Sequence, residues 1–265
     1  MKQKLIYTLI FIISFISFSA QNAKAVMEIN YEMKQISDST NRKNAAVMEF
    51  TLFCNKEESV YYNKDAKNFY DALNKNTGNK KNWTISNTAG MPKFPKVRGS
   101  VHKIREKLSV SLPVAKDIYQ FEEPELKWEV LQETKEIKGF KCQLAKTITD
   151  THDTFYAWFA RDIPIQDGPF RFKGLTGLIL EVYNKNKTIE IYATDIKKSD
   201  AVMEPIDYGR AIELKSKGQF LKMRSHYLQD PTGFNNHNIQ VTDQNGNDLN
   251  KKIDEKIKKI NVFLD

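Results

Sequence analysis

The sequence predicts a mainly β protein of the α+β class, built on a strongly curved antiparallel sheet or half-barrel with C-terminal helices. Apolar and polar residues alternate with a period of two in many segments. Turn-forming residues separate successive segments, which is typical of an antiparallel meander. Helical spacing of apolar residues is clearest near the end of the chain. The 265 residues show no internal repeat and no clean boundary, so we expect a single domain over residues 26–265.

The N-terminal segment has the pattern of a secretory signal peptide. A short basic start precedes an apolar run over residues 5–18, and small residues follow. This run is shorter than the ~20 residues that a helix needs to cross a bilayer. We therefore expect residues 1–25 to be a signal peptide, with no stable transmembrane segment left after processing. Cleavage after Ala20 is the alternative, but cleavage after Ala25 fits the small-x-small rule better. The protein would be exported, to the periplasm or to an outer-membrane-associated or extracellular position.

The charge pattern argues against a nucleic-acid partner. The net charge is +8 for the whole chain, and it falls to +5 without residues 1–25, which carry three lysines and no acid. The remaining basic residues are interspersed with acids. Nucleic-acid binding normally requires a concentrated basic patch.

The first half of the chain alternates predicted strands with turns. Strands are expected at residues 27–34, 45–54, 59–62 and 107–111, and a short helix at residues 66–73. Residues 74–100 are rich in Asn, Lys, Gly and Pro. They predict an irregular loop that is longer than compact domains usually contain.

The second half continues the meander and ends in helices. Strands are expected at residues 128–136, 140–149, 154–160, 178–183 and 188–196. Ser216 and Gln219 match a capping box, which predicts a helix that ends at Pro231. A last amphipathic helix is predicted from an apolar stripe formed by Ile253, Ile257, Ile260 and Leu264.

Two cysteines, Cys54 and Cys142, remain after processing, and both fall in predicted strands. An oxidising compartment would allow one disulfide between them. A free cysteine also packs well as a small apolar residue. Both alternatives remain open.

Residues 162–181 form the most distinctive segment, because they join an aromatic strand to an aliphatic one through two prolines and three glycines. Glycine allows backbone conformations or close approaches that a side chain would block, and proline fixes φ. The segment predicts either a rigid, buried crossover or a preformed, glycine-lined groove for a ligand or a partner strand. The candidate binding residues are Gly168, Pro169, Gly174, Leu175, Gly177 and Leu178.

The string GPFRFKGLTGLILE over residues 168–181 resembles the signature of the GLPGLI family, which comprises exported proteins of the Bacteroidota. Segments upstream are similar as well, at residues 31–33, 128–145 and 156–164. Thr176 departs from the family pattern, which has proline there. The resemblance implies export and a β-rich fold and adds no catalytic residue.

The sequence contains no complete catalytic constellation. The best candidate for a thiol nucleophile and its base is Cys142 with His152, next to Asp153. The spacing of His226, Asp230 and His237 fits no zinc signature. Glu122 and Glu123 are adjacent and would face opposite sides of a strand, so they do not suggest a hydrolase.

We therefore expect a non-enzymatic binding protein of the cell envelope without a cofactor or metal, whose partner is an apolar ligand or an envelope protein. An aromatic lining of the sheet under the terminal helices would suit an apolar ligand. The alternatives are an envelope structural or interaction protein, and a thiol-dependent enzyme that uses Cys142.

Overall fold

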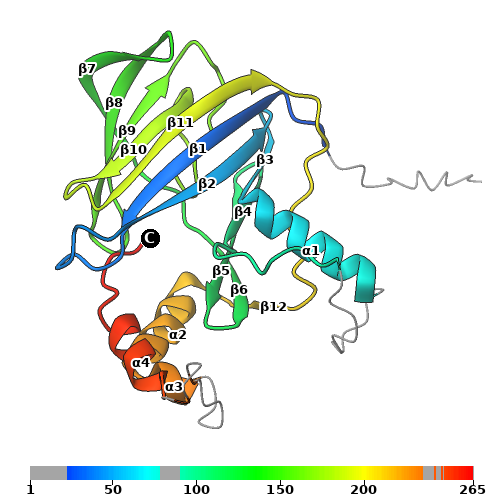
Figure 1. Cartoon of the computed structure of the whole chain (residues 1–265). Helices are drawn as coiled ribbons and strands as arrows, with labels where there is room; N and C mark the ends of the chain where they lie inside the picture. Colours follow the sequence, from blue (N-terminus) through cyan, green and yellow to red (C-terminus); the bar gives the residue numbers. More distant parts are fainter. Residues whose placement is uncertain (1–22, 78–89, 235–241, 243–245, 247, 265) are drawn as a thin grey trace, which may run out of the picture.

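The computed structural model describes residues 23–77, 90–234, 242, 246 and 248–264, and it places all the strands in one curved sheet with helices around it (Figure 1). The sheet has 12 strands and is not closed, since β12 and β7 lie at its two ends. The predicted mainly β architecture is confirmed. No helix in the described part of the chain is long and apolar enough to span a bilayer.

The sheet consists of two antiparallel meanders. The first contains β1 (Met27–Ile36), β2 (Ala45–Cys54), β3 (Glu58–Tyr62), β4 (Ser100–Ile104), β5 (Lys107–Val114) and β6 (Asp117–Glu122). The second contains β7 (Glu129–Ile137), β8 (Phe140–Ile148), β9 (Thr154–Ala160), β10 (Leu178–Asn184) and β11 (Ile189–Lys198).

The two meanders are joined through β1 and β11. These strands pair antiparallel, from Met27 opposite Lys198 to Gln35 opposite Ile189. The short strand β12 (Ala211–Glu213) then pairs in parallel with β6 and extends the sheet at that end. Apart from this parallel pair, all described strand pairings are antiparallel, as expected.

Two strands of the first meander, β4 and β6, were not predicted. Each belongs to a tight hairpin whose turn lacks the usual glycine or asparagine signal. Arg105 and Ala115 adopt positive φ in these turns, at 54° and 53°. Such conformations are uncommon for residues other than glycine, so the sequence pattern does not mark the turns.

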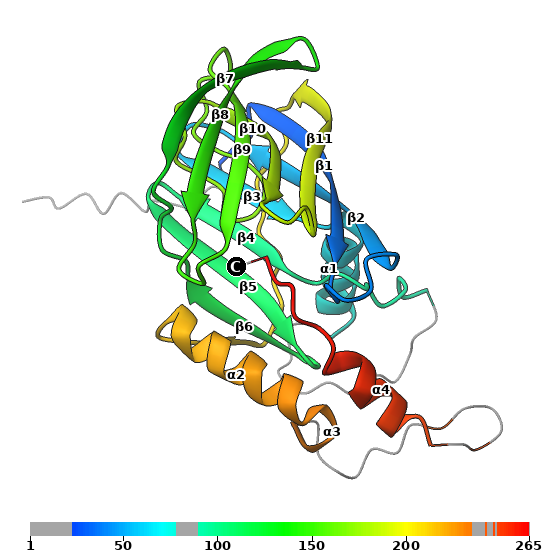
Figure 2. The ribbon, with the colours of Figure 1, turned by 90° about the vertical axis from the view of Figure 1, so that its left-hand side faces the viewer.

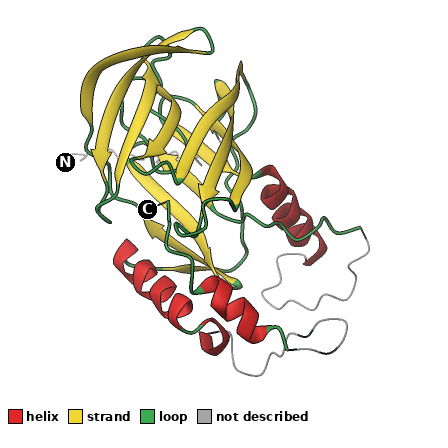
Figure 3. Cartoon of the chain, turned by 60° about the vertical axis from the view of Figure 1, so that its left-hand side comes forward, coloured by secondary structure: helices red, strands yellow, loops and turns green. Residues whose placement is uncertain are grey.

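The helices lie at the periphery of the sheet (Figures 2 and 3). They are α1 (Lys64–Thr77), α2 (Lys217–Gln229), the single turn α3 (Pro231–Phe234) and α4 (Asn250–Ile257). α2 packs on β5 and β6, where Phe220 stacks on Phe121 with 4.9 Å between ring centroids. The predicted capping box is incomplete: Ser216 forms no side-chain cap, while the Gln219 side chain accepts a bond from the Lys215 amide.

The prediction of a helix through Leu264 was wrong beyond Ile257. After α4 the chain leaves the helix and forms a tail over residues 258–264. The amide of Val262 donates to the carbonyl of Ser37, and its carbonyl accepts a bond from the Gln35 side chain. The apolar stripe at helical spacing therefore serves two different structures, the helix and an extended tail anchored to the end of β1.

The predicted irregular loop over residues 74–100 is replaced at both ends by regular structure. α1 continues to Thr77, and β4 begins at Ser100. Residues 78–89 of this loop lie outside the described residues.

Candidate functional site

β9 and β10 are neighbours in the sheet, and residues 161–177 join them by a long crossover that contains the distinctive segment. The crossover carries five buried apolar side chains into the main core: Ile163, Ile165, Phe170, Phe172 and Leu175. The ring of Phe172 lies 4.9 Å from that of Phe155 in β9. The crossover therefore fills space beside the sheet, and parts of it also line the cavities described below.

The glycines of the crossover are required by close packing. A side chain at Gly177 would drive its Cβ into the carbonyl oxygen of Ala160, and at Gly168 the Cβ would lie 2.6 Å from the carbonyl oxygen of Phe172. Gly174 differs, because it is exposed and has a φ of +89°. Of the six candidate binding residues, Gly168, Pro169, Leu175, Gly177 and Leu178 are buried, and only Gly174 lines the polar cleft described below.

A ring of four charged side chains fixes the crossover to the rest of the fold. Arg171 donates to Glu123, which follows β6, over 2.5 Å, and to Asp150 in the β8–β9 turn over 2.9 Å. Lys217, the first residue of α2, contacts the same two carboxylates at 2.8 and 2.9 Å. Arg171, Glu123 and Lys217 are almost completely buried. Two cations and two carboxylates compensate one another, as charges removed from water must.

A second charged cluster lies in the same crossover. The Lys173 ammonium donates to the Asp167 carboxylate and to the carbonyl of Gly168. Lys103 of β4 approaches Asp167 to 3.5 Å and donates to the carbonyl of Gln166. This cluster carries one more positive than negative charge, and it ties the crossover to the first meander.

Between the two clusters lies a small cavity of about 160 Å³, which we call the polar cleft. Its walls come from the β4–β5 turn, the chain after β6 and the crossover. The lining residues are Lys103, Arg105, Glu106, Leu108, Glu123, Glu125, Leu126, Gln166, Arg171, Lys173 and Gly174. The cleft thus combines carboxylates with cations, which is the composition needed for proton transfer and for stabilising negative charge.

Burial shifts the pKa values of two charged groups in the polar cleft. Burial raises the pKa of the Glu123 carboxyl, although Arg171 and Lys217 oppose this effect. Burial also lowers the pKa of the Lys173 ammonium, which Asp167 counteracts in part. The Nε of Arg171 is buried and has no hydrogen-bond partner among the described residues. The cleft therefore contains a carboxyl that holds its proton more tightly than usual and a donor available to an oxygen atom.

A wider cavity of about 950 Å³ lies at the start of β1 and the end of β11. Glu57 in its lining is 76% exposed, so its carboxylate is solvated and not shielded from water. Glu58, which also lines this cavity, has a side chain that is 18% exposed, and its carboxylate lies 3.0 Å from the His102 ring.

The two cysteines are free, buried thiols in this structure, Cys54 in β2 and Cys142 in β8. Burial raises the pKa of the Cys142 thiol to about 11, and its sulfur donates to the carbonyl of Phe140. The reactive form of cysteine is the thiolate. The buried position therefore gives no support to a nucleophilic role for Cys142 with His152.

The histidine and aspartate group considered for metal binding gains no support. No cluster of three or more metal-binding side chains occurs in the described parts of the chain. His226 and Asp230 lie at the end of α2, and His237 falls outside the described residues.

Sequence reasoning missed Glu123 as a functional candidate. Glu122 and Glu123 do face opposite directions, and Glu122 is exposed while Glu123 is only 4% exposed. The two acids therefore do not act as a pair, as expected. The buried member acquires a perturbed environment from Arg171 and Lys217, which are distant in sequence and not predictable from it.

Comparison with known proteins finds a partial match to one domain family. Residues 111–214 match the family model described as the N-terminal domain of N-glycanase peptide. Two solved structures of PNGF-II, in space groups C2 and P21, share 16% and 15% identity with TM-scores of 0.47 and 0.48. Each comparison covers 74% of this chain and 32% of PNGF-II, so the chain spans about a third of that protein.

An uncharacterised conserved protein from Thermus thermophilus is also similar, with a TM-score of 0.35 and 2% identity over 72% of this chain and 91% of that one. None of the curated proteins matches this chain.

The family match corrects the function expected from the sequence. An N-glycanase domain family is an enzyme family, so it contradicts the expectation of a non-enzymatic binding protein. The family that matches is also not the GLPGLI family, and the likeness of residues 168–181 to that signature stays a resemblance of sequence. The matched segment includes Glu123, Arg171 and Lys173 of the polar cleft.

Replacement of Gly177 by alanine tests the packing of the crossover. We expect a loss of about 1–3 kcal/mol in the free energy of unfolding, because the added Cβ meets the Ala160 backbone. Gly218 is the matched control, since a Cβ there meets only the Ser216 hydroxyl at 3.7 Å on a helix. Gly218→Ala should be neutral or stabilising by up to about 1 kcal/mol. Urea denaturation measures both, and equal stabilities would contradict the close packing.

Replacement of Lys217 by methionine tests the charged ring. We expect a loss of about 3–5 kcal/mol in the free energy of unfolding, because the buried Glu123 carboxylate is left to share Arg171 with the partly exposed Asp150. Lys222→Met on the exposed face of the same helix is the control and should change stability by less than about 0.5 kcal/mol. Urea denaturation midpoints compare the two variants. A Lys217 variant as stable as the Lys222 variant would show that the ring is dispensable.

Proposed function

We propose that this chain acts as an N-glycanase-type hydrolase, or as a domain of one, on the amide bond that links an N-glycan to asparagine. The observation that carries the proposal is the match of residues 111–214 to an N-glycanase domain family. The polar cleft supports it, because the matched segment supplies most of the charged groups there. The match does not assign the activity of the whole PNGF-II protein to this chain, since this chain spans about a third of the length of PNGF-II.

Hydrolysis of this amide needs groups that move a proton and groups that stabilise a developing oxyanion. Water attacks the amide carbonyl, the C–N bond breaks, and the leaving glycosylamine takes a proton while the asparagine becomes aspartate. In our proposal the Glu123 carboxyl transfers the proton, a role that its burial favours because burial raises the pKa of this carboxyl above its ordinary value. Arg171 and Lys173 would stabilise the negative charge on the carbonyl oxygen.

The test is release of glycan from a labelled peptide that carries one N-linked glycan. The full chain should convert the glycosylated asparagine to aspartate, which mass spectrometry detects. Glu123→Gln should lower the rate by about 100-fold or more, as removal of a proton-transferring group does. Asp150→Asn is the matched control, because Asp150 belongs to the same charged ring but does not line the polar cleft.

Both variants lose one carboxylate from the ring, so rates are compared at a temperature where circular dichroism shows both to be folded. Asp150→Asn should keep a rate within a few-fold of the wild type. Absence of glycan release by the wild-type chain would overturn the proposal. An unchanged rate of glycan release for Glu123→Gln would show that the polar cleft is not the site of hydrolysis.

Export remains part of the proposal and rests on the signal-peptide pattern. The structure favours the earlier of the two cleavage positions. Ala25 is buried, its amide donates to the carbonyl of Ala201, and Lys24 forms a bridge with Val202. Cleavage after Ala25 would remove these contacts, whereas cleavage after Ala20 keeps them.

We therefore expect the mature protein to begin at Gln21. Intact-mass analysis of protein secreted by its own cells measures the N-terminus directly. A mature chain that starts at Val26 would show that the contacts of Ala25 are not needed for the fold.

A further inference from the structure

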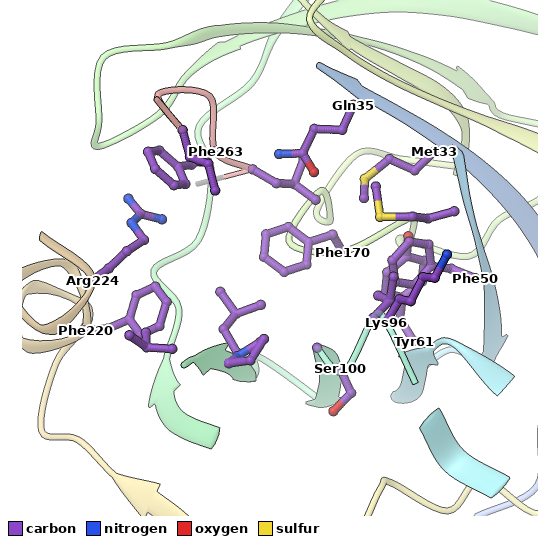
Figure 4. A pocket seen from close by; sticks show the side chains of 18 of the residues that line it. Met33, Gln35, Phe50, Tyr61, Lys96, Ser100, Phe170, Phe220, Arg224 and Phe263 are labelled. Atoms are coloured by element: carbon purple, nitrogen blue, oxygen red, sulfur yellow. The ribbon is translucent and has the colours of Figure 1, made fainter. Parts of the chain in front are cut away.

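A second cavity, which we call the apolar groove, lies between the sheet, α2 and the C-terminal tail (Figure 4). Its volume is about 340 Å³, in the range of small-molecule sites. Apolar and aromatic side chains from five parts of the fold form most of its lining. They include Met33 and Phe50 from the first meander, Phe170 from the crossover, Phe220 from α2 and Phe263 from the tail.

The hydroxyl group of Tyr61 is the unusual feature of the apolar groove. Tyr61 is 2% exposed, its ring stacks on Phe50 at 4.8 Å, and its hydroxyl has no hydrogen-bond partner among the described residues. A buried polar group without a partner costs free energy, so it is normally satisfied. Burial raises the pKa of this phenol, so the hydroxyl stays protonated and is a donor. It can therefore donate to an acceptor atom of a ligand.

The charges of the apolar groove favour an anion. Lys96 and Arg224 line it, and among the described residues that line it there is no aspartate or glutamate. In Figure 4 Lys96 lies on the same side of the cavity as Tyr61, and Arg224 lies on the opposite side. The guanidinium of Arg224 stacks over the ring of Phe263 at 3.8 Å. Without an acid, this cavity is not suited to the proton transfer assigned to the polar cleft.

We propose that the apolar groove binds an amphipathic anion with a single acyl chain, whose carboxylate accepts a hydrogen bond from Tyr61 and faces Lys96. The chain of the ligand lies along Met33, Phe170 and Phe220, which are apolar and line the groove. This site goes beyond glycan hydrolysis and uses none of the residues of the polar cleft. We infer the ligand class from three features of the described residues: an apolar volume, an unpartnered hydroxyl donor and the ammonium group of Lys96.

Isothermal titration with three dodecyl probes below their micellar concentrations tests the proposal. Dodecanoate should bind in a saturable manner with one site per chain. Dodecanol should bind more weakly, and dodecyltrimethylammonium at least tenfold more weakly than dodecanoate. Absence of saturable dodecanoate binding, or equal affinities for the anion and the cation, would overturn the proposal.

Tyr61→Phe separates ligand binding from folding. It removes one hydroxyl, so dodecanoate should bind about tenfold more weakly. The melting temperature of the free protein should rise by about 2–4 °C, because an unpartnered buried hydroxyl is lost. Tyr62→Phe is the matched control. Tyr62 is the next residue of β3 and packs with Val60 and Ala66 in an apolar cluster separate from the main core, so this substitution should leave the affinity for dodecanoate unchanged. Unchanged dodecanoate affinity in Tyr61→Phe would show that water alone satisfies the hydroxyl, and it would refute the site.

Discussion

The charged ring formed by Arg171, Glu123, Lys217 and Asp150 is the constraint on which both cavities depend. Arg171, Glu123 and Lys217 lose hydration on burial, and their mutual ion pairs, together with those to the partly exposed Asp150, compensate that loss. The ring can therefore form only when the crossover, the end of β6, the β8–β9 turn and the start of α2 are all in place. It converts separate parts of the chain into one rigid region.

The crossover also explains why the two cavities lie close to each other in the fold. Phe170 lines the apolar groove, and the next residue, Arg171, lines the polar cleft. Phe170 and Arg171 lie in a turn, in which Phe170 has a φ of 49° and the Phe172 amide donates to the Pro169 carbonyl, and their side chains line different cavities. Because the ring holds Arg171, it also holds Phe170.

Local patterns predicted most of the sheet but few of its long-range features. Alternation identified β1, β2 and the second meander, because each strand has one face in the core. The strands β4 and β6 were not predicted, because the turn residues Arg105 and Ala115 are not types that mark a turn in the sequence. The pairing of β1 with β11 and the tail after Ile257 could not be predicted, since both depend on partners far along the chain. The distinctive segment was found from its glycines, whereas its charges became meaningful only once Glu123 and Lys217 were seen beside them.

The junction of the two meanders has a consequence for how the chain reaches its native state. One edge of β1 has no neighbour until β11, which begins at Ile189, is available to pair with it. An open strand edge is a template for pairing with other molecules, and topologies rich in distant contacts fold slowly. Incomplete chains therefore expose this edge to one another, and self-association of unfinished copies competes with completion of the sheet.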